Sequence, residues 1–235
     1  MDSMSRRVSS SGIVGRSAEL AVARACLQDV LDGGSDRSAK VLLISGEAGI
    51  GKTRLLNEVL DRARDAGAMT ACGRCLEHGS EVRPLTAVAE ILAEIGPVVA
   101  SPDSASPSDA AGREDGVPLT ATPAEASANL FDHARSMMRA LSVRGPLVVA
   151  VEDLHWSDRT TRELVTELVR TRGLERVLFI VTYRSDELHR RHPLLPLLAD
   201  LEQAARPDRI ELGPLVETEM LELATEVLGR PVTEE

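Results

Sequence analysis

The chain has 235 residues, of which 43% are hydrophobic, 27% charged and only 2% aromatic, as expected for a globular domain with an aliphatic core. Its net charge of −10 argues against a nucleic-acid surface spread over the chain, because binding DNA or RNA backbones requires clustered Lys and Arg. Three sparse cysteines, a polar N-terminus without a secretory signal and the lack of a membrane-length apolar run predict a cytoplasmic protein without membrane contact.

The first quarter of the chain predicts a helix, a buried strand and a second helix. Residues 1–12 are polar, and we expect a disordered tail there. Ser17 is predicted to cap a helix that ends at Gly33–Gly34, with an apolar face formed by Leu20, Ala23, Leu27 and Leu31. The continuous apolar run 41–45 predicts a strand buried on both faces. A glycine-rich loop then leads into a helix predicted over 52–66.

A low-complexity segment follows the next strand and helix. Residues 68–75 predict the strand, and the helix is expected to run from near Pro84 to Gly96–Pro97. Residues 101–121 are rich in Ser, Pro, Ala, Asp and Gly and lack periodicity, which predicts a mobile surface insertion. The capping-box spacing of Thr122 and Glu125 then opens a helix whose apolar face is predicted to carry Leu130, His133, Met137 and Leu141.

The second half of the chain continues the alternation of apolar strands and amphipathic helices. Strands are predicted over 146–151, 176–184 and 209–212, and helices over 157–173, 192–205 and 216–229. Continuous apolar strands that alternate with helices imply a mostly parallel sheet covered on both faces. The predicted fold class is α/β, a three-layer sandwich around a five-stranded sheet, and one domain over 13–212 accounts for it.

Residues 46–53, GEAGIGKT, match the phosphate-binding pattern G-x-x-x-x-G-K-[ST] at every specified position, between a predicted strand and a predicted helix. Glycines let the backbone N–H groups turn onto phosphates, and the helix N-terminus attracts the anion. Lys52 is expected to reach the β- and γ-phosphates of ATP, and the Thr53 hydroxyl to bind Mg²⁺. The predicted nucleotide ligands are Gly46, Glu47, Ala48, Gly49, Ile50, Gly51, Lys52, Thr53 and Arg54.

Two carboxylates, Glu152 and Asp153, directly follow the apolar strand 146–151. In P-loop NTPases an acid at the end of such a strand holds Mg²⁺, and a neighbouring acid can polarise the attacking water. By register, Glu152 takes the metal position and Asp153 the position of the general base. The order Glu–Asp is the reverse of that in efficient hydrolases, so we expect slow hydrolysis.

Arg184 ends the predicted strand 176–184, and a polar residue at such a place can sense the γ-phosphate. The alternative is a surface ion pair between Arg184 and Asp186 or Glu187. Trp156, the only tryptophan, follows the acidic pair and either seats the loop near the γ-phosphate or covers the sheet edge.

These residues belong to an ordered series that resembles the NTPase domain of large ATP-binding LuxR-type bacterial regulators, also described as an Orc1-like AAA ATPase domain. The series consists of VGRSAEL (14–20), GEAGIGKT (46–53), GRCLE (73–77), RPL (83–85), VEDLHWSD (151–158), TYRSDELHRRHPLLPLL (182–198) and LGPL (212–215). It covers most of the chain, from about residue 13 to about residue 229, without the insertion.

The resemblance implies that Val14, Gly15 and Arg16 lie near the adenine and ribose, and that Arg184 is the γ-phosphate sensor. Such proteins are ATP-driven switches that convert from ADP-bound resting forms to ATP-bound forms competent for self-association. Family members continue through a helical lid, a winged helix, a repeat-rich sensor and a helix-turn-helix. We therefore expect 213–235 to begin a truncated lid element, and we expect no direct DNA binding by this chain.

The sequence thus predicts a P-loop NTPase that binds ATP or ADP with Mg²⁺, hydrolyses ATP slowly and acts as a switch in a transcription-regulatory protein. One alternative is a nucleotide-binding module without turnover. Another is a small-molecule P-loop kinase, which would need an acceptor site and an Arg-rich lid, whereas the insertion 101–121 contains only Arg113.

Overall fold

A computed structural model of the protein describes residues 13–34, 38–77, 85–99 and 123–228. The expected tail (1–12) and insertion (101–121) lie outside these residues, as do Pro84 and Thr122.

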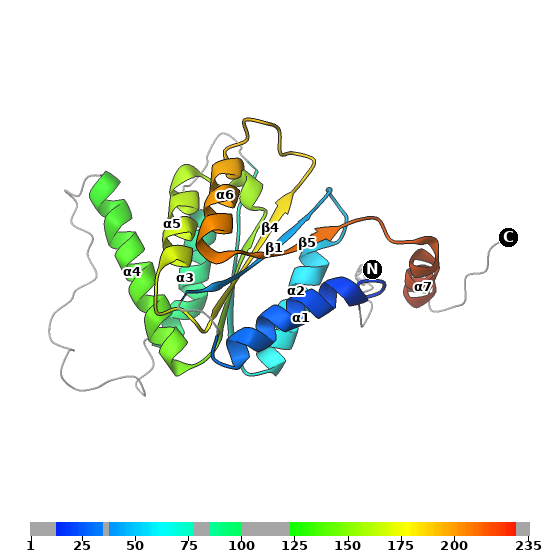
Figure 1. The fold of residues 1–235 in the computed structure, drawn as a ribbon, viewed down its shortest axis with the longest axis horizontal. Helices are drawn as coiled ribbons and strands as arrows, with labels where there is room; N and C mark the ends of the chain where they lie inside the picture. Colours follow the sequence, from blue (N-terminus) through cyan, green and yellow to red (C-terminus); the bar gives the residue numbers. More distant parts are fainter. Residues whose placement is uncertain (1–12, 35–37, 78–84, 100–122, 229–235) are drawn as a thin grey trace, which may run out of the picture.

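One parallel sheet in the strand order β2-β3-β4-β1-β5 forms the centre of the molecule. Its strands are β1 (Lys40–Gly46), β2 (Met69–Arg74), β3 (Leu147–Glu152), β4 (Val177–Arg184) and β5 (Asp208–Leu212). Two helices cover one face, α1 (Ser17–Leu31) and α2 (Lys52–Asp65) (Figure 1). The other face is covered by α3 (Thr86–Val99), α4 (Pro123–Arg144), α5 (Arg159–Arg170) and α6 (Leu194–Ala205). The predicted α/β class is confirmed.

The sheet separates two apolar cores, and β1 contributes to both. Val41 and Leu43 belong to the core beneath α3 to α6, whereas Leu42 and Ile44 belong to the core beneath α1 and α2. Successive side chains of a strand point to opposite faces, so a strand covered on both sides must be apolar throughout. This double burial explains the continuous apolar runs in the sequence.

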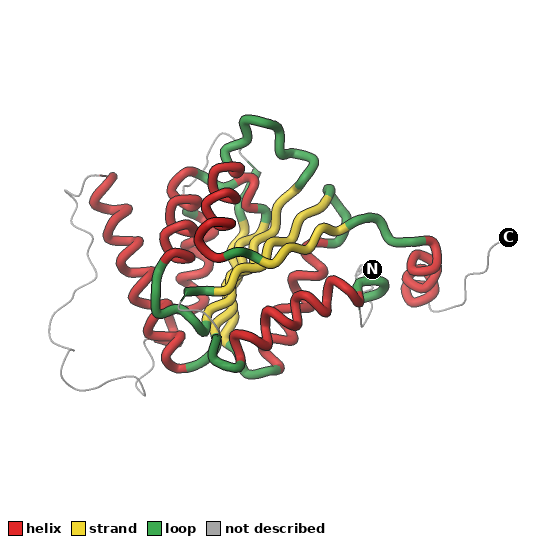
Figure 2. The backbone as a smooth tube through the Cα atoms, viewed as in Figure 1, coloured by secondary structure: helices red, strands yellow, loops and turns green. Residues whose placement is uncertain are grey.

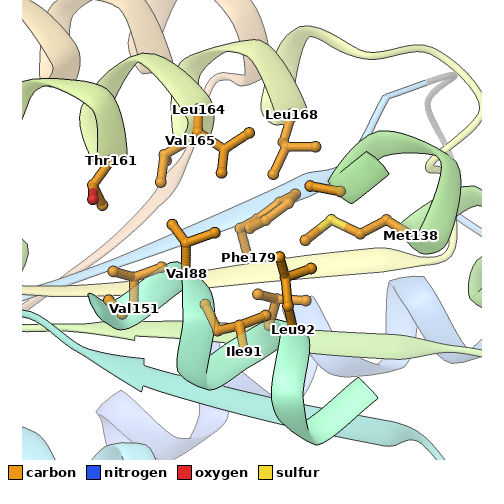
Figure 3. Close-up of a pocket in the computed structure, with 13 residues that line it drawn as sticks. Val88, Ile91, Leu92, Met138, Val151, Thr161, Leu164, Val165, Leu168 and Phe179 are labelled. Atoms are coloured by element: carbon orange, nitrogen blue, oxygen red, sulfur yellow. The ribbon is translucent and has the colours of Figure 1, made fainter. Parts of the chain in front are cut away.

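The larger core holds a small cavity of about 20 Å³ around Phe179, between α3, α4 and α5 (Figure 3). Its lining is apolar except for Thr161. Ligand pockets usually enclose several hundred Å³, so this cavity is a packing void rather than a binding site.

The last helix, α7 (Glu217–Leu228), stands apart from the layered body (Figures 1 and 2). None of its residues is buried. Within the part of the chain that the structure describes, every helix is too short or too polar to cross a bilayer.

Three local predictions are wrong. Ser17 is the first residue of α1, and Arg16 occupies the cap position without a side-chain capping bond. The helix α3 continues through Gly96–Pro97 to Val99, because burial of its apolar face, including Ile95, outweighs the local breaking tendency. On α4, His133 is exposed and Ala134 is buried in its place, since the buried stripe lies one residue further along the helix.

Candidate functional site

The parallel strands end at a common edge of the sheet, and their last residues are the polar residues singled out in the sequence. In the register of β1 and β4, Gly46 pairs with Arg184. In the register of β2 and β3, Arg74 pairs with Glu152. The carboxyl edge of a parallel sheet is where ligands bind in folds of this class.

The phosphate loop connects β1 to α2 in a conformation that requires glycine. Gly49 and Gly51 have φ angles of 75° and 108°, in the left-handed region where other residues are strained. A Cβ atom at either position would have no atom within 4 Å, so the loop is open to solvent. Because α2 begins directly after Gly51, its unpaired N–H groups face this opening.

Lys52 is the first residue of α2 and is 7% exposed. Its ammonium donates hydrogen bonds to the carbonyl oxygens of Gly46 (2.8 Å) and Glu47 (2.7 Å). Burial lowers the pKa of Lys52. The ammonium therefore lies within the curve of the loop, next to the space that phosphates would fill.

Glu152 is buried at the end of β3 and both of its oxygens accept hydrogen bonds. The Thr53 hydroxyl donates to Oε1, and the Arg74 guanidinium donates to Oε2, from Nε at 2.8 Å and also from Nη2. The side chain of Glu152 is 5% exposed and that of Arg74 is 50% exposed. A carboxylate in contact with the threonine hydroxyl of the loop has the hard oxygen donors that Mg²⁺ prefers.

Asp153 follows Glu152 but differs from it in backbone and environment. Its φ of 55° lies in the left-handed region, and its N–H donates to the Thr182 hydroxyl at 3.0 Å. Burial, together with the negative charge of Glu152, raises the pKa of Asp153. A carboxyl group whose pKa is raised towards neutrality is a better proton acceptor at neutral pH.

An open cleft of about 500 Å³ lies over the loop and α2, within the usual range for small-molecule sites. Its lining comes from the loop, α2 and the ends of β3 and β4, and consists of Gly49, Gly51, Lys52, Thr53, Arg54, Asn57, Asp153 and Arg184. Most of these residues are among the predicted site residues. Glu152 lies behind Thr53 rather than in this lining, while Glu47 and Ala48 are exposed on the loop.

Arg184 forms the ion pair that the sequence offered as one interpretation, and its role as a phosphate sensor stays a prediction. It lines the cleft with Lys52, as a phosphate sensor would, and it donates a hydrogen bond to Glu187, as an ion pair would. Its guanidinium carbon lies 4.6 Å from the centre of the Trp156 ring, a cation–π contact. Trp156 in turn donates from Nε1 to Glu187 at 3.2 Å.

Arg16 contacts the loop and the chain after β5 rather than the cleft. Its Nη2 donates to the carbonyl oxygens of Gly213 (2.7 Å) and Ile50 (3.4 Å). Gly15 approaches α7 closely, since a Cβ there would lie 2.6 Å from Glu219 Cδ. Val14, Gly15 and Arg16 are absent from the cleft lining.

These residues fit an ATP·Mg²⁺ group on physical grounds. A buried ammonium, open glycine N–H groups and a helix N-terminus converge on one space, and Thr53 and Glu152 supply oxygen donors beside it. In the described part of the chain, no three His, Cys, Asp or Glu side chains are placed together to hold a metal ion.

The structure adds Arg74 and Asn57 to the site residues found in the sequence, and it identifies Glu187 as the ion-pair partner of Arg184. Arg74 is brought to Glu152 by the pairing of β2 with β3, which the sequence does not specify. Asn57 lies one helical turn after Thr53, a spacing that the sequence does contain.

A comparison with curated proteins finds a relative that matches most of this chain. A relative from Rhizobium meliloti (strain 1021), an uncharacterized protein, is 32% identical in an alignment of 207 residues that covers 78% of this chain and 19% of that protein. The chain thus spans about a fifth of the length of this curated relative.

Solved structures share the fold at low sequence identity. The Orc2 protein of Aeropyrum pernix, solved with ADPNP and ADP, is 17% identical, with a TM-score of 0.57 over 95% of this chain and 54% of that one. Cdc6p of Pyrobaculum aerophilum is 16% identical, with a TM-score of 0.57 over 97% and 53% of the two chains. The Orc1 protein of Aeropyrum pernix, in complex with DNA, is 16% identical, with a TM-score of 0.55 over 96% and 52%. Residues 12–181 match the AAA ATPase domain family, and the chain belongs to that family.

Proposed function

We propose that this chain binds ATP with Mg²⁺, hydrolyses the ATP slowly and acts as a nucleotide-dependent switch within a cytoplasmic transcription-regulatory protein. The observation that carries the proposal is the contact of Thr53 with Glu152 beside the buried Lys52 at the floor of an open cleft. The loop amides and Lys52 bind the phosphates, and Arg54 lies at the rim of the same cleft. Val14, Gly15 and Arg16 are proposed to support the adenosine side.

Thr53, Glu152 and Asp153 would hold the Mg²⁺ ion, which neutralises charge on the triphosphate when bound. Asp153 accepts the proton of the attacking water, since its side chain lies in the cleft and burial raises its pKa. Lys52 and Arg184 stabilise negative charge on the transferred phosphoryl group.

Two features support slow turnover. Arg74 already neutralises one oxygen of Glu152, which weakens the attraction of that carboxylate for a cation. Asp153 has a shorter side chain than glutamate and reaches less far towards the water. Slow hydrolysis suits a switch, because the lifetime of the ATP state then sets the duration of the signal.

The proposed output is nucleotide-dependent self-association or contact with another protein. Residues 213–235 are proposed to begin a helical lid. The helix α7 carries the exposed apolar side chains Met220, Val227 and Leu228, and the exposed Val216 directly precedes it. The net charge of −10 supports a protein rather than a nucleic acid as the direct partner of this chain.

Measuring phosphate release from radiolabelled ATP at saturating Mg²⁺ tests the proposal. We expect slow release that Asp153→Asn slows further, by about 10²–10⁴-fold. ATP that is retained tightly without any turnover would exclude hydrolysis and leave a nucleotide-binding module. Transfer of the labelled phosphoryl group to a metabolite instead of water would identify a kinase.

A further inference from the structure

Glu187 accepts hydrogen bonds from two side chains, those of Arg184 and Trp156. Its Oε1 accepts a hydrogen bond from Arg184 Nη1, and its Oε2 accepts one from Trp156 Nε1 at 3.2 Å. The Arg184 guanidinium lies over the Trp156 ring, 4.6 Å from its centre. Two of the contacts that fix Arg184 thus depend on neighbours outside the phosphate loop.

His155 lies next to this group with both ring nitrogens lacking a hydrogen-bond partner, although its side chain is 0% exposed. An imidazole ring carries at least one N–H donor in either protonation state, so this buried side chain has a donor to satisfy. Its Nε2 lies 3.5 Å from Glu187 Oε2, slightly too far for a good hydrogen bond. A buried donor without an acceptor is unfavourable, and a small movement of Glu187 would supply the acceptor.

Arg184 has access to the cleft from its present position. It lines the cleft with Lys52 and is 28% exposed, and in the sheet it pairs with Gly46 at the start of the loop. A phosphate beyond Lys52 would compete with Glu187 for the same guanidinium, because Arg binds phosphate and carboxylate through the same donors.

We propose that Glu187 limits the preference of this site for a nucleoside triphosphate over a diphosphate, because it competes with the γ-phosphate for Arg184. With a diphosphate bound, Glu187 retains Arg184 on Trp156. With a triphosphate bound, the γ-phosphate takes Arg184, and Glu187 moves to accept a hydrogen bond from His155. The inference rests on the ATP binding proposed above, and Glu187 is a positioning residue because it acts through Arg184.

The exchange explains the unsatisfied imidazole. The starting state contains an arginine–carboxylate bond and a buried histidine without a partner. The final state replaces them with an arginine–phosphate bond and a histidine–carboxylate bond, so Glu187 remains satisfied. The γ-phosphate contributes binding free energy, and the free energy needed to separate Arg184 from Glu187 offsets part of this contribution.

Calorimetric titration of the full chain with AMP-PNP and with ADP, each with Mg²⁺, tests the proposal. In Glu187→Gln, we expect the ratio of the two affinities to shift about tenfold towards AMP-PNP, since no ion pair has to be broken. Asp186→Asn is the matched control, because Asp186 is exposed and its charge acts on Lys52 as that of Glu187 does. This control is expected to change both affinities by similar factors.

Trp156 is the only tryptophan of the chain and supplies a second measurement. In the unmodified protein, AMP-PNP should change its fluorescence emission and ADP should not, because only the triphosphate removes Arg184 from the ring. Arg184→Ala should eliminate this difference between the nucleotides.

The proposal is overturned if AMP-PNP binds normally and Glu187→Gln leaves the affinity ratio within twofold of the unmodified protein. It is also overturned if Asp186→Asn shifts the ratio as much as Glu187→Gln. Failure of both nucleotides to bind the folded, unmodified chain would instead refute the proposed function, and this inference with it.

Discussion

Arg74 and Glu152 pair at the ends of two neighbouring strands, and the guanidinium of Arg74 binds one oxygen of a carboxylate whose other oxygen accepts from Thr53. One partner of this ion pair is buried and the other is half exposed. The half-exposed Arg74 therefore compensates the negative charge of Glu152, which is buried at the end of β3.

Arg74→Ala is expected to reduce the free energy of unfolding by about 1–2 kcal/mol, because it leaves the buried Glu152 carboxylate without a counter-charge. Chemical denaturation at neutral pH measures this change. Arg64→Ala is a suitable control, since Arg64 pairs with Asp61 and both side chains are more than half exposed. Equal effects of the two substitutions would contradict the role assigned to Arg74.

Lys52→Ala is expected to abolish ATP binding, because Lys52 is the ammonium placed inside the phosphate loop. Lys40→Ala serves as the control, since Lys40 lies at the other end of β1 and pairs with Asp208 at 2.8 Å. Calorimetry with ATP and Mg²⁺ provides the measurement. Micromolar binding by Lys52→Ala would refute the assignment of the loop.

Asp153→Asn is expected to retain ATP binding and to slow hydrolysis by about 10²–10⁴-fold, the usual contribution of a general base. Phosphate release and calorimetry on the same preparation separate the two effects. If Glu152→Gln stops turnover while Asp153→Asn does not, the two carboxylates have the opposite roles.

The same Asp153→Asn substitution should raise the free energy of unfolding at pH 7. Burial and the charge of Glu152 raise the pKa of Asp153 in the fold, so the stability of the native protein is lost as the pH rises from about 3.8 through the raised pKa. An uncharged Asn avoids this loss, and the difference between the proteins should vanish below that range. Denaturation curves at pH 7 and pH 3 compare the two conditions.

The lowered pKa of His155 predicts that the protein loses stability in acid. This pKa is about 4 in the fold against 6.5 for the free side chain, so the unfolded chain binds more protons between these values. Stability should fall as the pH decreases from 6.5 towards 4, by at most about 1.4 kcal/mol per pH unit from this group. His155→Gln should flatten the profile within this window. An unchanged profile would show that His155 is not the titrating group.

The phosphate-loop motif can be recognised in the sequence alone, whereas the order of the strands in the sheet cannot. Residues 46–53 are contiguous, so their spacing and flanking elements specify the loop without knowledge of tertiary structure. The strand order and the neighbour of β3 depend on crossovers between distant segments, and these decide that Arg74 rather than another cation meets Glu152.

Local signals also fail where tertiary packing dominates. Ser17 has the residue type of a cap, yet the chain places Arg16 there, because Arg16 reaches the carbonyl oxygens of Gly213 and Ile50. These partners are far from Arg16 in the sequence, so the helix start could not be derived from propensities alone.

The backbone of Asp153 has a consequence for the order of the two carboxylates. A left-handed residue is tolerated by Asp and Asn more readily than by longer side chains such as Glu. Exchanging the pair to Asp–Glu would therefore strain the turn after β3 at the residue that we propose to activate water. The Glu–Asp order therefore suits the path of the main chain, and an Asp–Glu order would require a different turn after β3.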